Sequence, residues 1–588
     1  MQKEFKTVDR RNFVKAAVTA PLLLSSKGAF PAESNPGTST PDGKSELDKR
    51  FNLTLRRVLQ GDSPSYSAEF LLADVKPTAE RRFTEYSGDL SGRYIGALAS
   101  AAGVYGVDVP MLDSFVNQVI ALQKPEGYFG STFHFENPKD ADMALLWGNG
   151  RLLVGLLEYY RYKPSDPVLA ASKRIGDFLV RISPLMLSKQ IRDAFGAQHF
   201  ASSYICWTQQ TEGLALLYQI TKDERYRQLA ESIATVIERR PGDHAHGYLS
   251  SLRGVMDLYA MTRDSNLLHA CETAWQDITS SRDLLLTGGV PEGWSPNNHR
   301  TEGCGEADWV RLNLQLWKAT DNAKYLATAE RAIFNEFAFN QFATGDFGHR
   351  VYTETGLPAA GAARAWWCCT LHGLRCFPDI RESAFRRTDS GLHYDTPVDA
   401  QIKSPAVSVS AESMLAKNGT VRLRILRASK EKTRLSVRKP AWADSVQLHL
   451  QGSDPISSSD PLYVSAEKAW SPGEVVEVKY EMNLRSEPGG NDRRAFWFGP
   501  WLLGASAADN PAYFNELTIE NRLFGTPSPD RGTDAPGSFS VPIAATSTGY
   551  SQAEYPEQPG HVALRAIAEQ TGQPTTSWEL RFLSRRTE

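Results

Sequence analysis

The feature that most constrains this chain's fold is a short turn segment that occurs four times between residues 163 and 326. In each copy one helical pattern ends, an Asp or Asn is placed to turn and cap the chain, and a second helical pattern begins. The Asp residues of the four copies, Asp166, Asp223, Asp264 and Asp321, are 57, 41 and 57 residues apart. This spacing suits one helical hairpin each, and repeated hairpins predict a helical solenoid or a closed ring of helices.

The helical pattern extends from about residue 47 to residue 388. Apolar residues recur at three- and four-residue spacing in stretches such as Leu153–Tyr160 and Leu214–Ile220. No atypical capping repeat is evident, which favours a closed ring over an open array. We therefore predict an (α/α)6 barrel, a toroid of six helical hairpins, over residues 47–388.

The hydrophobic pattern changes after about residue 390. Apolar and polar residues alternate strictly in Thr420–Ile425 and in Val476–Tyr480, and turn signals such as Ser471-Pro472-Gly473 separate such runs. These features predict an antiparallel β-sandwich over residues 389–507 and a second β module over residues 508–588. The expected fold class is multidomain α + β, a barrel followed by antiparallel β-sandwich modules.

The N-terminus has the pattern of an export signal. Arg10 and Arg11 are followed by Phe13-Val14-Lys15 and a short apolar stretch, Ala16–Leu24. This order predicts a twin-arginine signal peptide over residues 1–32, a linker over 33–46, and a periplasmic or secreted bacterial protein. The alternative is a chance arginine pair in a disordered tail. Because the twin-arginine route carries folded cargo, a metal site can be filled in the cytoplasm, where thiols stay reduced.

Composition excludes several classes of protein. The chain has 588 residues, of which 41% are hydrophobic and 23% charged, and its net charge is −3. A basic nucleic-acid binder, a disordered chain and a coiled coil all have different compositions, so no nucleic-acid partner is expected. No apolar run approaches the roughly 20 residues of a membrane span. Six cysteines over this length do not make a disulfide scaffold.

Two short segments contain the residues best suited to bind a metal. Glu302 and Cys304 lie at the start of a helical pattern, and Cys368 and Cys369 are adjacent further along the chain. At a turn, adjacent sulfurs can converge on one ion, and three thiols with a carboxylate make a tetrahedral set that suits Zn²⁺. The alternatives are a vicinal disulfide or buried thiols that act as small hydrophobic groups.

The same segments resemble glycoside hydrolase family 127, the β-L-arabinofuranosidase family. The specific part of the resemblance is Glu302-Gly303-Cys304 together with Cys368-Cys369-Thr370-Leu371-His372-Gly373. Supporting segments, spread over roughly residues 50 to 510, are Asp89–Tyr94, Gln123–Tyr128, Leu286–Val290, Arg438–Ala443, Trp470–Glu474 and Gly499–Trp501. The resemblance implies an (α/α)6 barrel followed by β-sandwiches.

The resemblance also implies the roles of individual residues. The zinc ligands correspond to Glu302, Cys304, Cys368 and Cys369, the nucleophile to Cys368, and the acid/base glutamate to Glu292. A thiolate can replace the usual nucleophilic carboxylate of a retaining glycosidase only if it is ionised, and zinc coordination deprotonates a thiol. Ligand count alone favours the opposite interpretation, because a zinc site with four protein ligands is usually structural.

Three further residues align with sugar-binding positions of the family or lie where they would line the pocket. His244 corresponds to a histidine that contacts the sugar, and Glu330 to a glutamate that holds sugar hydroxyls. The alternatives are a surface-loop histidine and a surface salt bridge of Glu330 with Arg331 or Lys324. Tyr352 is expected either in the pocket lining or in the core.

The chain departs from the family pattern in two places. Ala144-Leu145 and Gly150-Arg151 stand where the family has histidines, so that Arg151 replaces a neutral sugar-binding group. Arginine favours planar anions, which predicts a carboxylated sugar as substrate, unless Arg151 pairs with a carboxylate of the barrel. The stretch between Glu292 and Glu302 is also shorter than in typical members.

The resulting prediction is a retaining exo-glycoside hydrolase of the β-L-arabinofuranosidase type that acts on an oligosaccharide or glycoside. The rival hypotheses are a hydrolase of acidic sugars on the same scaffold and a non-catalytic glycan-binding toroid with structural zinc. A lyase would require a Tyr or His base, and no motif indicates one.

Overall fold

The computed structural model describes most of the chain from Glu46 onward. The described residues are 46–511, apart from 61–63, 77–80, 197–202, 239, 241–243, 295–299 and 359–360, together with 513–514, 520–523, 528–529, 539–546, 558–569 and 576–584. The predicted signal peptide, residues 1–32, and all but the last residue of the predicted linker lie outside them. Within the described part of the chain, no helix combines the length and the apolar character needed to cross a bilayer.

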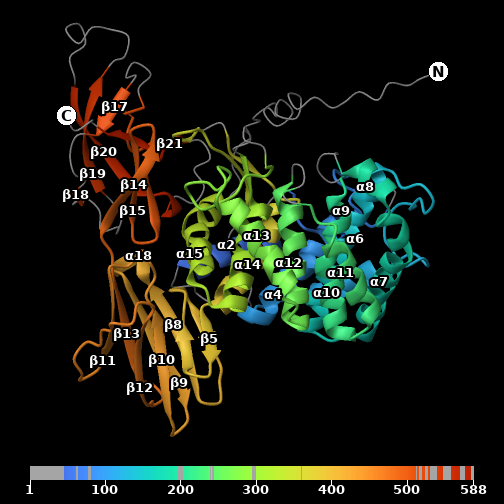
Figure 1. The fold of residues 1–588 in the computed structure, drawn as a ribbon, viewed down its shortest axis with the longest axis horizontal. Coiled ribbons are helices and arrows are strands. Elements are labelled where there is room, and N and C mark those ends of the chain that lie inside the picture. Colours follow the sequence, from blue (N-terminus) through green and yellow to red (C-terminus); the bar gives the residue numbers. More distant parts are fainter. Residues whose placement is uncertain are drawn as a thin grey trace, which may run out of the picture. The chain divides into compact units, whose positions relative to one another are not determined.

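Six helices between residues 89 and 383 contact one another in a closed cycle. Figure 1 shows this helical part of the chain, coloured from blue through green to yellow. In cyclic order the six helices are α4 (Asp89–Tyr105), α6 (Asp140–Tyr162), α10 (Gln210–Thr221), α12 (Ala245–Thr262), α14 (Gly303–Thr320) and α17 (Cys369–Ser383). The last of them contacts the first. Most residues of these ring helices are buried on all sides, as expected for helices enclosed by others.

A second helix packs against the outside of each ring helix. These outer helices are α5 (Leu112–Ile120), α7 (Asp166–Met186), α11 (Glu224–Ala234), α13 (Ser265–Thr279), α15 (Ala323–Arg331) and α2 (Glu46–Gln60), which packs on α17. Shorter helices and turns of helix occur in the connections, namely α3 (Ala68–Leu72), α8 (Lys189–Phe195), α9 (Ile205–Thr208), the π-helix η2 (Ala332–Phe337) and α16 (Ala338–Asn340).

The recurring turn segments have one shared geometry in three of the four hairpins. Asp223, Asp264 and Asn322 are helix N-caps whose side chains accept a hydrogen bond from the backbone N–H two residues later. In each case the preceding residue ends the previous helix in the left-handed conformation. The predicted cap is thus confirmed for Asp223 and Asp264. In the fourth repeat Asn322 is the cap, and Asp321 is the left-handed residue.

Asp166 differs from the other turn residues. It is the first residue of α7, and the N-cap is Ser165, which makes no side-chain capping bond. Its place in the spacing pattern is therefore confirmed, but its predicted role as a cap is wrong.

The antiparallel pattern predicted after residue 390 corresponds to two sheets. One has the order β12–β10–β6–β5 and the other β11–β13–β9–β8–β7. Their strands are β5 (Phe385–Thr388), β6 (Gly391–Tyr394), β7 (Ala400–Ile402), β8 (Val407–Met414), β9 (Thr420–Ala428), β10 (Lys432–Arg438), β11 (Ser445–Leu450), β12 (Tyr463–Ala469) and β13 (Val475–Glu481), with helix α18 (Leu415–Asn418) after β8. All neighbours are antiparallel except β6 and β10.

A third, larger sheet contains the C-terminal strands. Its strands are β14 (Leu484–Gly490), β15 (Arg493–Phe498), β16 (Trp501–Ser506), β17 (Glu520–Leu523), β18 (Ser528–Pro529), β19 (Phe539–Thr546), β20 (Gln558–Ala566), β21 (Trp578–Glu579) and β22 (Phe582–Ser584), and the 3-10 turn η4 (Ile567–Glu569) follows β20. β3 (Gly356–Leu357), from the helical half of the chain, pairs with β21. The predicted boundary between residues 507 and 508 falls inside this sheet, between β16 and β17.

Candidate metal centre and active site

Three sulfurs and one carboxylate from two distant segments converge in the structure. The Sγ atoms of Cys368 and Cys369 are 3.6 Å apart, and those of Cys304 and Cys369 are 3.8 Å apart. Oε1 of Glu302 lies 3.6 Å from Sγ of Cys368 and 3.9 Å from Sγ of Cys369. The candidate ligand atoms of all four residues lie within 4.8 Å of one another.

These distances fit a tetrahedral metal site and exclude a disulfide. A Zn²⁺ ion with bonds of about 2.3 Å to sulfur and about 2.0 Å to oxygen requires ligand–ligand edges of roughly 3.8 Å and roughly 3.5 Å. A disulfide requires about 2.05 Å, so the predicted alternative of a vicinal disulfide is wrong. All six cysteines have free thiols. The donor set is therefore suited to a soft or borderline divalent ion such as zinc.

Two neighbouring ring helices position these residues. Glu302 ends the short strand β1 (Arg300–Glu302) and is followed directly by α14, while Cys368 is the N-cap of α17 and Cys369 its first residue. The cluster thus lies at the N-termini of both helices, where the helix dipoles stabilise negative charge. Gly303 is required here, because a Cβ atom would lie 3.0 Å from Cβ of Cys369 and 2.9 Å from Asn340.

The cluster residues differ in their accessibility. Cys304 and Cys369 are 0% exposed, Glu302 is 4% exposed and Cys368 is 8% exposed. Of the three cysteines, Cys368 is therefore the most exposed residue.

Burial makes these thiols poor nucleophiles by themselves. Desolvation raises the pKa of Cys304, Cys368 and Cys369 well above the usual value for a thiol. A bound cation reverses this effect, because metal coordination favours the thiolate. Burial also opposes ionisation of Glu302, but hydrogen bonding from His244 holds the pKa of Glu302 well below its ordinary value.

His244 lies beside the cluster and not in a surface loop. It is the N-cap of α12 and is 3% exposed, and its Nε2 is 3.3 Å from Oε2 of Glu302. Its ring packs against that of Trp147 at 5.2 Å between centroids. The predicted alternative of a surface histidine is therefore wrong.

Glu292 lies next to the same segments. Its carbonyl accepts a 2.8 Å hydrogen bond from the N–H of Ala245, the residue after His244, and its N–H donates to the carbonyl of Arg300 at 2.6 Å. Its carboxylate is bonded to the Arg300 guanidinium. Since Arg300 and Glu302 are two residues apart in β1, their side chains share one face of that strand. Glu292 is 7% exposed.

Glu330 and Tyr352 are held by other partners. The Glu330 carboxylate is buried and bonded to Arg438 of β10 and to Nε1 of Trp442, 3.3 Å away. This is neither the predicted sugar contact nor the predicted surface salt bridge. Tyr352 is buried and donates its hydroxyl hydrogen to Glu336 in the π-helix η2. The structure thus brings neither residue into contact with the sulfurs.

Arg151 is paired inside the helical ring. Its Nη1 lies 3.4 Å from Oε2 of Glu212, its Nη2 is bonded to Gln209, and its guanidinium lies 5.2 Å from the Trp147 ring centroid. Burial lowers the pKa of Arg151 to about 10 although Glu212 opposes this shift. The predicted alternative, pairing with a carboxylate of the helical domain, is confirmed, and this removes the basis for an acidic substrate.

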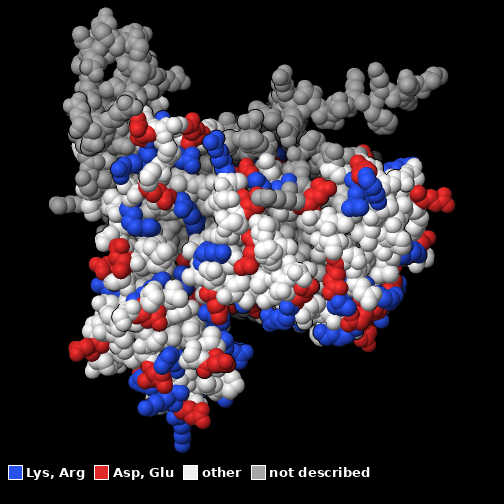
Figure 2. Space-filling view, viewed as in Figure 1, with Lys and Arg blue, Asp and Glu red and all other residues white. Residues whose placement is uncertain are grey.

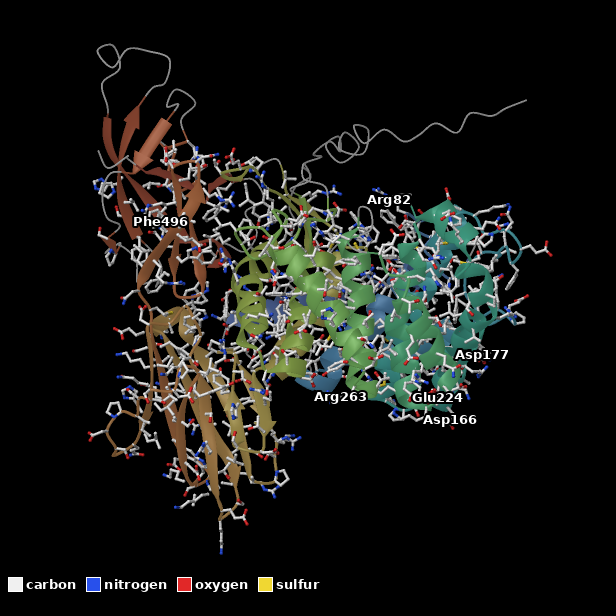
Figure 3. The ribbon with its side chains drawn as sticks, viewed as in Figure 1. Arg82, Asp166, Asp177, Glu224, Arg263 and Phe496 are labelled. Carbon is white, nitrogen blue, oxygen red and sulfur yellow. The ribbon has the colours of Figure 1, made fainter. Side chains whose placement is uncertain are left out.

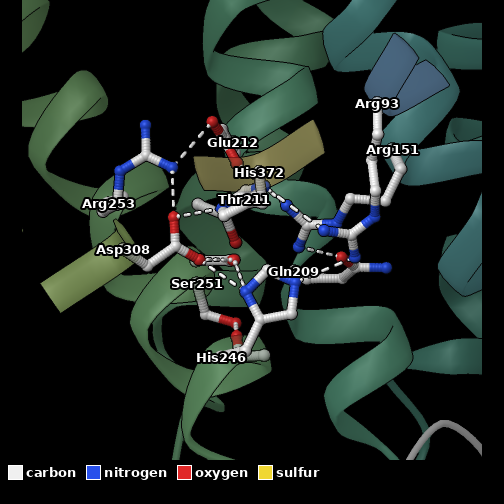
Figure 4. Close-up of polar contacts among 12 residues, drawn as sticks. Arg93, Arg151, Gln209, Thr211, Glu212, His246, Ser251, Arg253, Asp308 and His372 are labelled. Carbon is white, nitrogen blue, oxygen red and sulfur yellow. Dashed lines mark hydrogen bonds and ion pairs between the residues drawn. The ribbon is translucent and has the colours of Figure 1, made fainter. Parts of the chain in front are cut away.

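A second polar cluster, which the sequence did not predict, is centred on Asp308 (Figure 4) and reaches Cys304 through Arg93. Asp308 accepts hydrogen bonds from Nδ1 of His246 at 2.7 Å and from Nε2 of His372 at 2.8 Å. The opposite nitrogens of both rings face Arg93, whose Nη1 is also 3.5 Å from Sγ of Cys304. Two of these four residues, Arg93 and His372, occur in segments that carry the family resemblance, but no regular sequence spacing connects the four.

Aromatic side chains lie on the chain next to Cys368. The ring of Trp367 stacks on Phe83 with 5.2 Å between centroids, and Phe83 stacks on Tyr86 at 6.1 Å. Phe83 has a positive φ of 65°, which is strained for a bulky residue. Figure 3 shows the neighbouring Arg82 at the upper end of the helical domain.

The opposite end of the helical ring contains a cavity of about 680 Å³. All six ring helices line it, with residues that include Glu158, Glu212, Asp257 and Arg311. Figure 3 shows Arg263, another lining residue, at the lower end of the domain. On the face shown in Figure 2, basic and acidic side chains are interspersed, in agreement with the small net charge.

The helical ring with a thiol-rich centre at its helix N-termini, followed by antiparallel sheets, agrees with the architecture that the sequence resemblance implies. The model of the GH127 catalytic domain, described as β-L-arabinofuranosidase, matches residues 74–382, and the GH127 middle-domain model matches residues 392–482. The chain therefore belongs to glycoside hydrolase family 127, and its substrate is a glycoside.

Solved structures agree with this assignment at the level of the fold. A GH127 β-L-arabinofuranosidase from Geobacillus stearothermophilus T6 has a TM-score of 0.71 and 16% identity, with 93% of this chain and 100% of that chain covered. A second GH127 β-arabinofuranosidase has a TM-score of 0.69 and 17% identity, with 91% and 94% covered. No curated protein matches the chain by sequence.

Proposed function

We propose that this chain is a retaining, exo-acting glycosidase of the β-L-arabinofuranosidase type, with a Zn²⁺ ion held by Glu302, Cys304, Cys368 and Cys369. The observation that carries the proposal is the convergence of three sulfurs and one carboxylate at tetrahedral spacing, with Cys368 as the most exposed of the three cysteines. Family membership supports the reaction class, and the names of two similar structures support the arabinofuranoside.

The bound ion would keep the thiols ionised in a buried setting that otherwise raises their pKa. In the first step Sγ of Cys368 attacks the anomeric carbon, and the bond from that carbon to the glycosidic oxygen breaks. Glu292 gives its proton to the departing oxygen. In the second step Glu292 takes a proton from water, the water oxygen bonds to the anomeric carbon, and the carbon–sulfur bond breaks.

The neighbours of Glu292 and Glu302 support these roles. Arg300 contacts the Glu292 carboxylate and so holds it beside β1, the strand that ends in Glu302. His244 contacts Glu302 from the side of α12, so it holds the ligand carboxylate in place and presents its ring beside the site. We assign His244 to sugar binding as well. No such role is retained for Glu330, Arg151 or Tyr352.

We also propose an architecture and a location. The closed cycle of six helices, each with an outer partner, supports an (α/α)6 barrel over residues 47–388. A β-sandwich begins at residue 389, and a C-terminal β module follows it. The arginine pair at Arg10 and Arg11 supports twin-arginine export to the periplasm or the medium. A reporter fused to residues 1–46 should reach the periplasm only while both arginines are present.

The proposed mechanism is tested by covalent labelling and by product stereochemistry. A cyclophellitol-type electrophile should label Cys368 in the zinc-loaded enzyme, and the first product of β-L-arabinofuranoside hydrolysis should keep its anomeric configuration. Cys368→Ser and Glu292→Gln should each reduce kcat by at least about 100-fold, within the range of general acid–base contributions.

Cys376→Ser is the matched control, because Cys376 is a buried thiol on the same helix whose Sγ lies near the carbonyl of Ala307. It should retain activity. Label on another residue would overturn the nucleophile assignment. Unchanged turnover in both Cys368→Ser and Glu292→Gln would favour a glycan-binding protein with structural zinc.

A further inference from the structure

Arg93 connects the sulfur cluster to the polar cluster centred on Asp308. It is a buried residue of α4, 5% exposed. Its Nε donates to Oδ1 of Asp89 at 2.7 Å, and its Nη1 lies 3.5 Å from Sγ of Cys304. The ring nitrogens Nδ1 of His372 and Nε2 of His246 lie 3.2 Å and 2.9 Å from its two terminal nitrogens.

These contacts determine the tautomers of both histidines. A guanidinium only donates hydrogen bonds, so the nitrogens that face Arg93 must accept. The other nitrogen of each ring then carries the hydrogen and donates to Asp308, at 2.7 Å for His246 and 2.8 Å for His372. Two neutral imidazoles therefore join Arg93 to Asp308 (Figure 4).

This arrangement excludes a second metal site and fixes the guanidinium. His246, Asp308 and His372 have the spacing of a metal site, but their ring nitrogens are already used by Arg93 and Asp308. Asp308 in turn accepts hydrogen bonds from Arg253 at 2.9 Å and from the Ser250 hydroxyl at 2.6 Å. Arg93 is thus held on three sides and directs one N–H group toward Cys304.

The three sulfurs are consequently not equivalent. Cys304 receives an N–H group from a buried cation, whereas among the described residues no side-chain N–H lies within hydrogen-bond distance of Sγ of Cys368. A hydrogen bond from a cation withdraws charge from a thiolate, and nucleophilicity falls with basicity. Such contacts behind a metal ligand also strengthen metal binding.

We infer that Arg93 is a positioning residue that keeps Cys304 bound to the metal as an unreactive ligand. The inference rests on the proposed metal centre. It names a residue outside the ligand set that distinguishes Cys304 from Cys368, the more exposed cysteine.

The test compares Co²⁺ binding and alkylation in the full-length wild-type protein and in Arg93→Met. Co²⁺ is used because its sulfur-to-metal absorption reports coordination without turnover. In Arg93→Met we expect Co²⁺ affinity to fall by about 10- to 100-fold, the range for loss of a group that orients a metal ligand. Iodoacetamide should label only Cys368 in the Co²⁺-loaded wild type, and both Cys368 and Cys304 in the variant, as read by peptide mapping.

Arg151→Met is the matched control, since Arg151 is another buried arginine of a ring helix and is bonded to Glu212 and Gln209, not to Asp308 or a sulfur. It should bind Co²⁺ and be labelled like the wild type. Equal effects of both substitutions, or wild-type behaviour of Arg93→Met, would overturn the inference. If Arg93→Met does not fold, Arg93→Lys is held to the same criteria, because one ammonium group cannot bond Asp89, Cys304 and both rings together.

Failure of the proposed function gives a different result. A wild-type protein that takes up no Co²⁺ would overturn the metal centre itself, and the inference with it. A wild type that binds Co²⁺ and hydrolyses the glycoside, with Arg93→Met unchanged, would overturn the inference alone.

Discussion

The sulfur of Cys304 lies 3.8 Å from the sulfur of Cys369, although 65 residues separate them in the chain. The reason is the cyclic order of the helices. Helices α14 and α17 are neighbours in the ring, and both begin at the end where the cluster lies. The 64 intervening residues contain the outer helix α15, the π-helix and the strands that return the chain to this end.

Removal of the metal should destabilise the helical domain. A ligand that binds only the folded state stabilises it by about 2.7 kcal/mol at 100 times its dissociation constant. We therefore expect a lower Tm after treatment with a chelator, and recovery when Zn²⁺ is added back. Cys369→Ser should abolish the recovery, while Cys271→Ser, at a buried thiol on outer helix α13, should not. Calorimetry provides the measurement, and an unchanged Tm after demonstrated loss of metal would contradict the prediction.

The turn residues should differ in their contribution to stability. Asp223→Ala removes an N-cap hydrogen bond and should lower the free energy of unfolding by about 1 kcal/mol. Asp166→Ala removes a side chain that makes no capping bond and should change it by less than about 0.5 kcal/mol. Urea unfolding followed by circular dichroism would measure both, and equal values would contradict the predicted difference between a capping and a non-capping residue.

Arg151 should contribute to stability and not to substrate choice. Arg151→Met removes one cation from Glu212, which keeps Arg253 at 3.1 Å and Arg375 at 3.0 Å. Because Glu212 stays paired, the free energy of unfolding should fall by about 1–3 kcal/mol, the range for one hydrogen bond to a charged group. A fall of about 3–5 kcal/mol would be expected only if a buried charge were left unpaired. The ratio of kcat/KM values for neutral and carboxylated glycosides should not change. A selective loss of the carboxylated substrate would restore the hypothesis of an acidic sugar.

Asp257 should make stability depend on pH in the mildly acidic range. Burial in the wall of the cavity raises its pKa to about 6 from an ordinary value of 3.8. The folded state therefore binds this proton more tightly than the unfolded state, so the contribution of Asp257 is fully present below about pH 4 and is lost as the pH rises through 6. The free energy of unfolding of Asp257→Asn should therefore rise relative to that of the wild type, by up to about 3 kcal/mol between pH 4 and pH 7. A difference that stays constant with pH would contradict the shifted pKa.

Local sequence patterns predicted the parts of the structure that depend on neighbouring residues. The four turn segments identified the hairpins, because an Asp or Asn after a helix satisfies backbone N–H groups wherever it occurs. Strict alternation identified strands such as β9 and β13, since alternate side chains of a half-buried sheet face the core. The boundary near residue 507 was less accurate, because β16 pairs with β20 and β21, which follow it far along the chain.

The site was predictable only where the residues themselves carry the chemistry. Three cysteines and a glutamate indicate metal binding by their donor atoms, without any knowledge of distance. Glu330 shows the limit of that reasoning, because its position on α15 relative to Arg438 of β10 depends on how the helical half packs against the β strands. Arg93 and Asp308 show the same limit. They are joined by hydrogen bonds through two histidines on different helices, and no periodic sequence pattern predicts such contacts.

The amino-acid sequence by itself determined the helical hairpins, the change to strands, the metal-binding donor set and the family. Those properties follow from side-chain chemistry and from contacts a few residues apart. Tertiary structure alone decided that Arg151 pairs with Glu212, that Glu330 is bonded to Arg438, and that Arg93 lies against Cys304. Closing the ring brings together charged groups that the chain keeps far apart, and in a buried interior each must find a partner.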